Sequence, residues 1–247
     1  MTLASLPSKC STCALGQFCL PVGLNAEESL RLDALARDKL RLKKGEPLFE
    51  QGAVTSAVYA VRLGTLKTSA ALADGRSQVT GFHLPGELIG LDAIGAGAYP
   101  SSALALEDSE VCVIRVTELD TLSRQLPGLQ AQYHRLMSRE ISEGHLHFLS
   151  LGSMRAEERL ANFLLNLSDR YALRGYAANE FNLRMSREDI GSYLGMQIET
   201  VSRLFSRFVD SGLLQVKQRH VKFIDIDGVR QLAGRAPITS HTCPHNA

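Results

Sequence analysis

Three cysteines lie within ten residues near the start of the chain, with the spacing Cys10-x2-Cys13-x5-Cys19, and a fourth, Cys112, lies far along it. Thiolates are ligands of iron–sulfur clusters and of tetrahedral zinc, and a Cys-x2-Cys pair also supports thiol redox chemistry. Four sulfurs brought together from these two places could hold either metal centre. The spacing alone leaves an iron–sulfur cluster, zinc and free or redox-active thiols open, and Cys112 by itself also fits a small buried strand residue.

The fifth cysteine lies in the run His241-Thr242-Cys243-Pro244-His245, which superficially resembles a metal-binding motif. We interpret this run as part of a solvated, disordered tail at residues 235–247. An odd number of cysteines in a long chain without an apolar secretory segment argues against a disulfide framework and for a cytoplasmic protein. No Ser/His/Asp arrangement, Walker loop or paired carboxylates in a suitable context indicate an enzyme.

Side chains that can read DNA bases gather on a predicted helix that begins near residue 197. Arg203 can pair with guanine O6 and N7, Glu199 can accept a hydrogen bond from cytosine N4, and Ser202 can bond base edges or phosphate. Glu199 and Arg203 would also suit an i,i+4 ion pair on a protein-binding helix. The elements around these three residues favour DNA binding.

Those elements have the pattern of a winged helix-turn-helix. Ser186 with Asp189 predicts a capped first helix, and Gly195 predicts a tight turn before the second. The second helix has an apolar face that we expect to be buried, comprising Val201, Leu204, Phe205 and Phe208. The wing is expected from two β-rich runs, 213–217 and 221–226, with residues 218–220 as the turn between them.

Between Lys43 and about Arg115 the sequence consists of short β-rich runs separated by glycines and other turn residues. This pattern is typical of an antiparallel β-barrel or jelly roll. The runs at 58–63 and 66–69 are predicted strands, and Asp74-Gly75 suits a hairpin turn.

Helical periodicity lies on both sides of this β-rich region. Residues 26–40 carry apolar positions on one helical face, with Asn25 and Glu28 as a capping pair. The longest periodic segment begins at Pro127 and ends near Leu151, with heptad spacing that suits either pairing with another helix or packing on its own domain. The predicted dimer seam comprises Met137, Ile141, Gly144, Phe148 and Leu151.

The 247 residues carry 27 Lys+Arg and 26 Asp+Glu, and this formal charge of +1 excludes a protein coated in positive charge. The part up to Ser150 has 14 basic and 16 acidic residues and the rest has 13 and 10, so the C-terminal part is mildly basic. No stretch reaches the roughly 18 consecutive apolar residues that cross a bilayer. The expected parts are a cysteine-rich segment (1–25), a sensor domain (26–126), a dimerisation helix (127–151), a DNA-binding domain (152–234) and the tail.

This order of parts resembles the FNR/ANR branch of the CRP/FNR superfamily of bacterial transcription regulators. The resemblance extends from about Cys10 to Gly234, and it includes the stretch 81–90 and the run Glu199-Thr200-Val201-Ser202-Arg203. It implies an α+β fold with a cyclic-nucleotide-binding-like sensor domain, a long dimerisation helix and a C-terminal winged helix-turn-helix.

The resemblance also implies an oxygen-sensing homodimer with a [4Fe-4S] cluster. The dimer would bind an inverted repeat of the TTGAT…ATCAA kind in double-stranded DNA and contact RNA polymerase, and loss of the cluster in oxygen would separate it. The implied cluster ligands are Cys10, Cys13, Cys19 and Cys112, and the implied base readers are Glu199, Ser202 and Arg203.

Proteins of the CRP branch bind a cyclic nucleotide, and they place an Arg followed by Ser or Thr after a Gly-Glu-Leu stretch to hold its phosphate. Here the segment after Gly86-Glu87-Leu88 runs through residues 95–103 without an Arg. A buried phosphate without a cationic partner is strongly disfavoured. We therefore predict that the chain binds no cyclic nucleotide.

Three residues depart from the family pattern. Gly144 stands where many FNR proteins carry an acidic residue in the dimer helix, so lost repulsion favours the dimer while glycine's poor helix propensity opposes it. We expect altered oxygen control of dimerisation. Ala14 follows the second cysteine where Ser is common, which could change oxygen sensitivity, and Arg76 stands where an acidic residue often contacts RNA polymerase.

Overall fold

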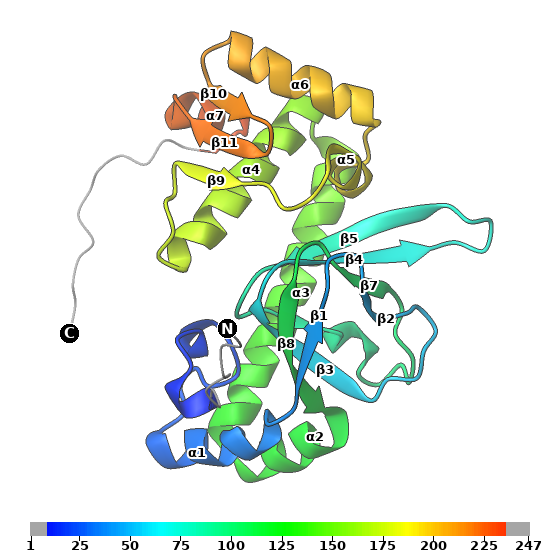
Figure 1. Cartoon of the computed structure of the whole chain (residues 1–247), viewed down its shortest axis with the longest axis vertical. Coiled ribbons are helices and arrows are strands. Elements are labelled where there is room, and N and C mark those ends of the chain that lie inside the picture. Colours follow the sequence, from blue (N-terminus) through cyan, green and yellow to red (C-terminus); the bar gives the residue numbers. More distant parts are fainter. Residues whose placement is uncertain (1–8, 236–247) are drawn as a thin grey trace, which may run out of the picture. The chain divides into compact units, whose positions relative to one another are not determined.

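The computed structural model describes residues 9–235, so Cys243 and the predicted tail after Arg235 lie outside the described residues. The chain divides into two compact units between Leu146 and His147. The first unit carries two four-stranded sheets and the second a three-stranded sheet with helices (Figure 1). Within residues 9–235, no helix is both long and apolar enough to cross a membrane.

The two sheets of the first unit confirm the β-rich region. Their strands are β1 (Lys39–Leu42), β2 (Pro47–Phe49), β3 (Ala57–Leu63), β4 (Leu66–Ala71), β5 (Ser77–His83), β6 (Leu88–Ile89), β7 (Ser102–Ala105) and β8 (Ser109–Arg115). All pairs are antiparallel, in the orders β1-β8-β3-β6 and β2-β7-β4-β5. The sheets face each other as in a jelly roll and do not close into a barrel.

The alternative of a closed barrel is therefore wrong. Strands β2 and β6 have only three and two residues, which is too short to complete a continuous ladder around a barrel. The space between the sheets is filled by side chains from both, including Leu66 and Val111, and by Tyr99, whose ring stacks on Phe49 with centroids 3.8 Å apart. The β4–β5 hairpin carries the predicted turn and projects from its sheet (Figure 1).

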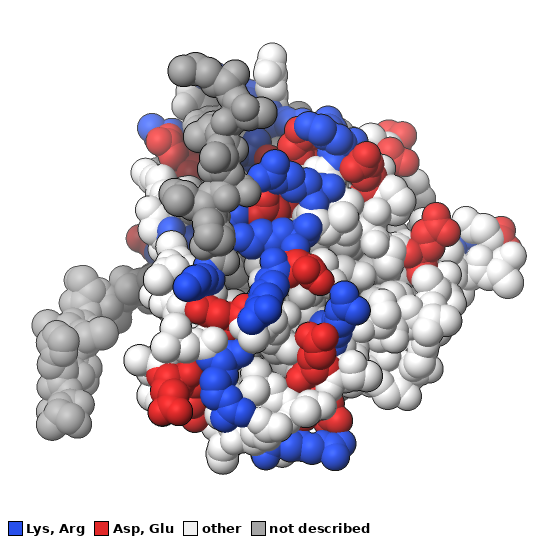
Figure 2. Space-filling model, turned by 60° about the horizontal axis from the view of Figure 1, so that its bottom comes forward, with Lys and Arg blue, Asp and Glu red and all other residues white. Residues whose placement is uncertain are grey.

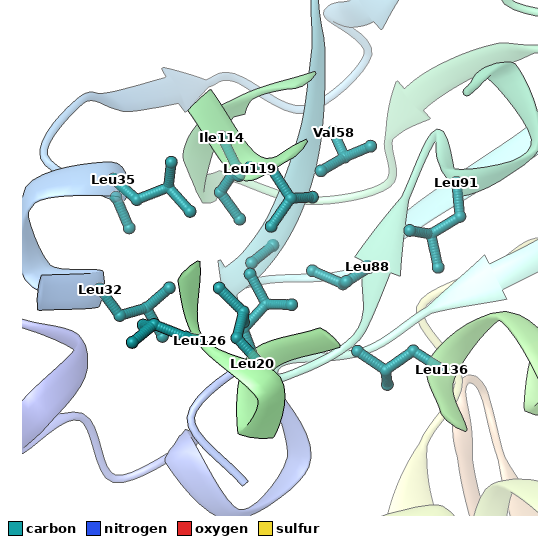
Figure 3. Packing of buried hydrophobic residues seen from close by; sticks show 13 residues of the cluster. Leu20, Leu32, Leu35, Val58, Leu88, Leu91, Ile114, Leu119, Leu126 and Leu136 are labelled. Carbon is teal, nitrogen blue, oxygen red and sulfur yellow. The ribbon is translucent and has the colours of Figure 1, made fainter. Parts of the chain in front are cut away.

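A second core lies where helices cover β3, β6 and β8. Helix α1 (Ala26–Leu35), helix α2 (Val116–Gln125) and the start of α3 (Pro127–Ser153) bury leucines there, including Leu32, Leu119 and Leu136 (Figure 3). The capping pair at the start of α1 is confirmed. The predicted extension of this helix to residue 40 is wrong, because Leu40 belongs to β1 and pairs with Val111.

Helix α3 has two different halves. Its buried residues are Leu129, Gln132 and Leu136, all in the first half. From Arg139 to Leu146 every residue is exposed in the single chain. The first half therefore packs on its own unit, and the second half offers a surface.

The second unit contains the predicted winged helix-turn-helix. Its elements are α4 (Ala156–Leu173), β9 (Glu180–Asn182), α5 (Arg187–Leu194), α6 (Ile198–Asp210), β10 (Leu214–Lys217), β11 (His220–Phe223) and α7 (Ile226–Leu232). The sheet order is β10-β11-β9, so the wing hairpin pairs with a third strand that sequence patterns did not indicate. The predicted turn is one residue shorter, since His220 pairs with Lys217 in the ladder.

Charges on the described residues are mixed. On the face shown in Figure 2, Lys and Arg side chains lie interspersed with Asp and Glu, as a formal charge of +1 leads one to expect. Affinity for a charged partner must therefore come from particular residues.

Candidate functional site

Four cysteines line one pocket in the first unit, which we call the cysteine pocket. Cys10, Cys13 and Cys19 come from the N-terminal segment, and Cys112 comes from β8. The segment consists of two short 3-10 turns, Cys10–Thr12 and Gly16–Phe18, neither of which has a fully buried residue. The remaining wall is apolar except for Arg62.

Contacts with several elements hold the N-terminal segment in place. The backbone N–H and the hydroxyl of Ser11 donate to the two carboxylate oxygens of Asp33 on α1, at 2.8 and 2.7 Å. Gln132 Nε2 on α3 donates to the carbonyl oxygen of Cys19 at 3.0 Å. Phe18 rests against Gly86, where an added Cβ would lie 2.8 Å from the Phe18 Cβ. The segment thus touches α1, α3 and the turn before β6.

The sheet supplies the fourth cysteine through pairing that is distant in sequence. Cys112 lies in β8, an inner strand of its sheet, opposite Lys39 of β1 on one side and Ala60 of β3 on the other. Two residues earlier, the buried Glu110 forms ion pairs with Arg62 and Arg41. These pairs fix the edge of the pocket that carries Arg62.

The environment of the pocket opposes free thiolates. Burial, together with the neighbouring sulfurs of Cys19 and Cys112, raises the pKa of Cys10 to about 12. Burial also raises the pKa of Cys19 to about 12, and it raises the pKa of Cys112, where Lys39 and Arg62 act in the opposite direction. A bound metal centre removes this penalty because its positive charge stabilises thiolates.

Four thiols are a suitable set of ligands for a metal centre. Their sulfur atoms are nevertheless not placed close enough together to bind one metal ion. Among residues 9–235, no group of three or more His, Cys, Asp or Glu is placed to hold a metal ion. What supports a metal centre is that four thiols, three from the N-terminal segment and one from β8, line the same largely apolar pocket. The ligand roles of these cysteines remain predictions.

The helix-turn-helix is built by strong local signals. The Ser186 hydroxyl accepts from the N–H of Asp189 at 3.0 Å, and the Asp189 carboxylate accepts from the N–H of Ser186 at 2.9 Å, which confirms the predicted cap. Gly195 ends α5 in the left-handed region at φ +62°. Gly191 is equally constrained and was missed, since an added Cβ would lie 2.6 Å from the carbonyl oxygen of Met196.

Helix α6 separates a buried face from an exposed one. Its buried residues are the predicted Val201, Leu204, Phe205 and Phe208. Glu199, Ser202 and Arg203 are exposed together, and Arg203 Nη2 lies 3.3 Å from Thr200 Oγ1. Arg207, also on the outward side, instead forms an ion pair with Glu157 of α4. The exposed face can enter a DNA groove, and the reader roles of its three residues remain predictions.

The predicted dimer seam is divided along α3. Met137 packs against the core of the first unit, whereas Ile141 and Phe148 are 57% and 78% exposed. Gly144 faces open space, with no atom within 4 Å of an added Cβ. Leu146 and Leu149 are also exposed, at 65% and 51%, and were missed because they lie outside the heptad positions. Several large apolar side chains exposed on one stretch of helix favour an interface there.

The segment that would meet a cyclic phosphate is acidic. Between Leu91 and Ala103 the only charged residue is Asp92, in a 3-10 turn, and burial raises the pKa of its carboxyl. Tyr99 fills the centre of the jelly roll and its hydroxyl donates to the carbonyl of Ala57 at 2.6 Å. No cationic group from this segment is available to a phosphate.

Two family models match the chain. Residues 39–125 match the cyclic nucleotide-binding domain, and residues 158–232 match the Crp-like helix-turn-helix domain. Among solved structures, that of FixK2 from Bradyrhizobium japonicum is similar with a TM-score of 0.73 and 29% identity, and the match covers 82% of this chain and 98% of that one.

Curated relatives match over nearly the whole chain. The transcriptional regulatory protein btr of Bordetella pertussis is 54% identical over 92% of this chain and 93% of its own length. The fumarate and nitrate reduction regulatory protein of Escherichia coli K12 is 46% identical (91% and 90%), and the transcriptional activator protein anr of Pseudomonas aeruginosa is 47% identical (91% and 92%). These relatives are regulators, in agreement with the expectation that the chain is not an enzyme. The chain belongs to the CRP/FNR family and is a DNA-binding transcription regulator of the FNR/ANR type.

Proposed function

We propose that this regulator senses oxygen through a [4Fe-4S] cluster held by Cys10, Cys13, Cys19 and Cys112. The observation that carries the proposal is the gathering of these four thiols around one pocket from two segments of the first unit that are distant in sequence. When bound, the cluster supplies an oxygen-labile group. Names of relatives such as fumarate and nitrate reduction regulatory protein agree with control by oxygen supply.

The contacts of the N-terminal segment provide a route from the pocket to α3. Gln132 donates to the carbonyl of Cys19, and Cys10 and Cys19 pack on the core that contains Leu136. A change in this segment alters the support of the first half of α3. The second half exposes Ile141 and Phe148, which we propose pair with a second copy of the chain.

Dimerisation places two copies of α6 on one DNA duplex. We propose that Glu199, Ser202 and Arg203 read each half of an inverted repeat of the TTGAT type in the major groove. Genomic DNA as the partner places this activity in the cytoplasm. We propose no cyclic nucleotide as a ligand, because Asp92 occupies the segment where a cation would be needed.

Contact with RNA polymerase is part of the proposal, but the β4–β5 turn has its own chemistry. Arg76 forms an ion pair with Asp74, whose carboxyl pKa is lowered by hydrogen bonds from Arg76. The two charges largely cancel at this turn. An activating contact there would differ from one made by an unpaired acidic residue.

The test is anaerobic purification of the full chain, with iron, sulfide and zinc analysis. We expect a brown protein that absorbs near about 400 nm, binds an inverted repeat as a dimer, and loses colour and DNA binding together in air. Colourless protein with stoichiometric zinc would replace the proposal with a zinc-stabilised regulator. Reversible thiol oxidation without metal would replace it with a thiol-redox protein.

Matched serine variants assign the ligands. Cys112→Ser should abolish cluster binding and lower anaerobic operator affinity at least tenfold, since a missing ligand in such a site costs most of the metal affinity. Cys243→Ser removes the same atom outside the described residues and should retain iron and affinity. Equal iron content in both variants contradicts the ligand set.

A further inference from the structure

The last turns of α3 lie in the same compact unit as the helix-turn-helix and contact it at two points. The ring of His147 stacks on that of Tyr193 in α5, with centroids 4.1 Å apart and an interplanar angle of 14°. Phe163 of α4 tilts against the same tyrosine ring at 5.8 Å. Tyr193 is therefore packed between α3 and α4.

The second contact lies one helical turn further along α3. An added Cβ at Gly195 would lie 3.2 Å from Leu151 Cδ2 and 3.6 Å from Arg159 Nη1. The same Arg159 nitrogen donates to the carbonyl of Leu151 at 3.4 Å. The turn between α5 and α6 thus rests directly on α3, so the direction of α6 follows the direction of the α3 end.

We propose that His147 is a positioning residue for DNA binding, which by stacking on Tyr193 fixes the helix-turn-helix to α3 and so sets the half-site spacing that the dimer accepts. This inference rests on the proposed function, because it needs a dimer that pairs through α3 and reads an inverted repeat. His147 itself touches no base.

The spacing of the half-sites also sets their relative rotation about the duplex axis. Inserting one base pair between half-sites turns one of them by roughly 35° about the duplex axis and shifts it along that axis. A helix-turn-helix that is fixed rigidly to α3 cannot follow that rotation. A helix-turn-helix that is joined to α3 only by the main chain and the Leu151 contact can follow that rotation more easily. Stacked aromatic rings resist tilting because their attraction depends on ring geometry.

The experiment measures anaerobic operator binding of the full chain on inverted repeats with identical half-sites and centres moved by −1, 0, +1 and +2 base pairs. The wild-type protein should lose about tenfold or more for a one-base-pair change. In His147→Ala, affinity at the natural spacing should fall several-fold, and the penalty for the changed spacing should shrink to about threefold or less.

Two further variants separate positioning from simple stability. His147→Phe keeps an aromatic ring on Tyr193 and should restore the wild-type spacing penalty. Tyr193→Leu removes the stack from the other side and should reproduce His147→Ala. A base change in the half-site should weaken all variants as it weakens the wild-type protein, because the readers on α6 are intact.

The inference is overturned if His147→Ala keeps the full spacing penalty, or if it weakens binding equally at every spacing. Failure of the proposed function looks different. In that case the wild-type protein itself binds a single half-site as tightly as the repeat, or binds neither, whatever residue stands at position 147.

Discussion

The helix-turn-helix takes all its parts from one run, residues 186–208, whereas the cysteine pocket joins residues 10–19 to Cys112 from the middle of a sheet. The first is fixed by its own capping hydrogen bonds and glycine turn. The second depends on contacts between distant segments, such as those of Ser11 and Gln132. The helix-turn-helix can thus stay folded when the contacts of the cysteine pocket are lost.

Among substitutions that affect only the helix-turn-helix, Gly191→Ala should have the largest effect. Its Cβ would lie 2.6 Å from the Met196 carbonyl, so we expect roughly 1–3 kcal/mol of destabilisation of the second unit and loss of operator binding. Urea unfolding and DNA titration measure both. Gly152→Ala is the matched control, because nothing lies within 4 Å of its added Cβ. Loss of iron from the Gly191 variant would contradict the independence of the two sites.

Arg203→Ala sharpens the comparison by leaving the fold intact. Removal of a bidentate contact should cost roughly 1–3 kcal/mol and relax specificity at one base pair of each half-site. Lys217→Ala, on the exposed wing, should weaken binding to all sequences and reduce the salt slope by about 1 per protomer. If the two variants lose affinity in the same sequence-independent way, Arg203 is not a base reader.

Substitutions of Gly144 test the exposed surface of α3. The position is open in the single chain, so Gly144→Ala should gain about 1 kcal/mol of helix stability and strengthen the dimer. Gly144→Asp adds facing carboxylates and should weaken the apo-dimer. Sedimentation of both variants in air compares them directly. A strictly monomeric wild-type apo-protein with no operator binding would count against altered oxygen control.

The smallest effect is a pH dependence of the cysteine pocket without metal. The folded pKa of Cys10 and Cys19, about 12, lies above the ordinary 9.0, so the folded chain holds protons that the unfolded chain releases. The free energy of unfolding of the apo-protein should fall as pH rises from about 9 toward 12, by a modest amount since these thiols are partly exposed. Urea midpoints at pH 8 and pH 10 measure this, and the double serine variant should flatten the difference.

The helix-turn-helix could be predicted because the sequence patterns that specify it are local. The capping residues, the turn glycine and the apolar residues of the helix face all lie within a few residues of the side chains that they position. The wing's third strand, β9, was missed because three residues carry too little pattern. Gly191 was missed because the close approach of the Met196 carbonyl is a property of the folded turn.

The cysteine pocket could be predicted only in part. The spacing of Cys10, Cys13 and Cys19 already places them together, but the position of Cys112 beside them depends on β8 lying between β1 and β3. No local pattern encodes that order, and the family resemblance supplied it. Leu40 was assigned to a helix because it follows the helical spacing of the preceding apolar residues. Its pairing with Val111 in the sheet could not be seen in the local sequence.

Gly86, in the turn before β6, helps to set the position of the N-terminal segment. It adopts φ +92° and forms a seat for Phe18, so even a single methyl group there collides with the N-terminal segment. Because a left-handed φ disfavours any side chain, Gly86→Ala strains the turn before β6 as well as the contact with Phe18. Under the proposed function, Gly86→Ala should therefore displace the N-terminal segment and lower operator binding even without oxygen.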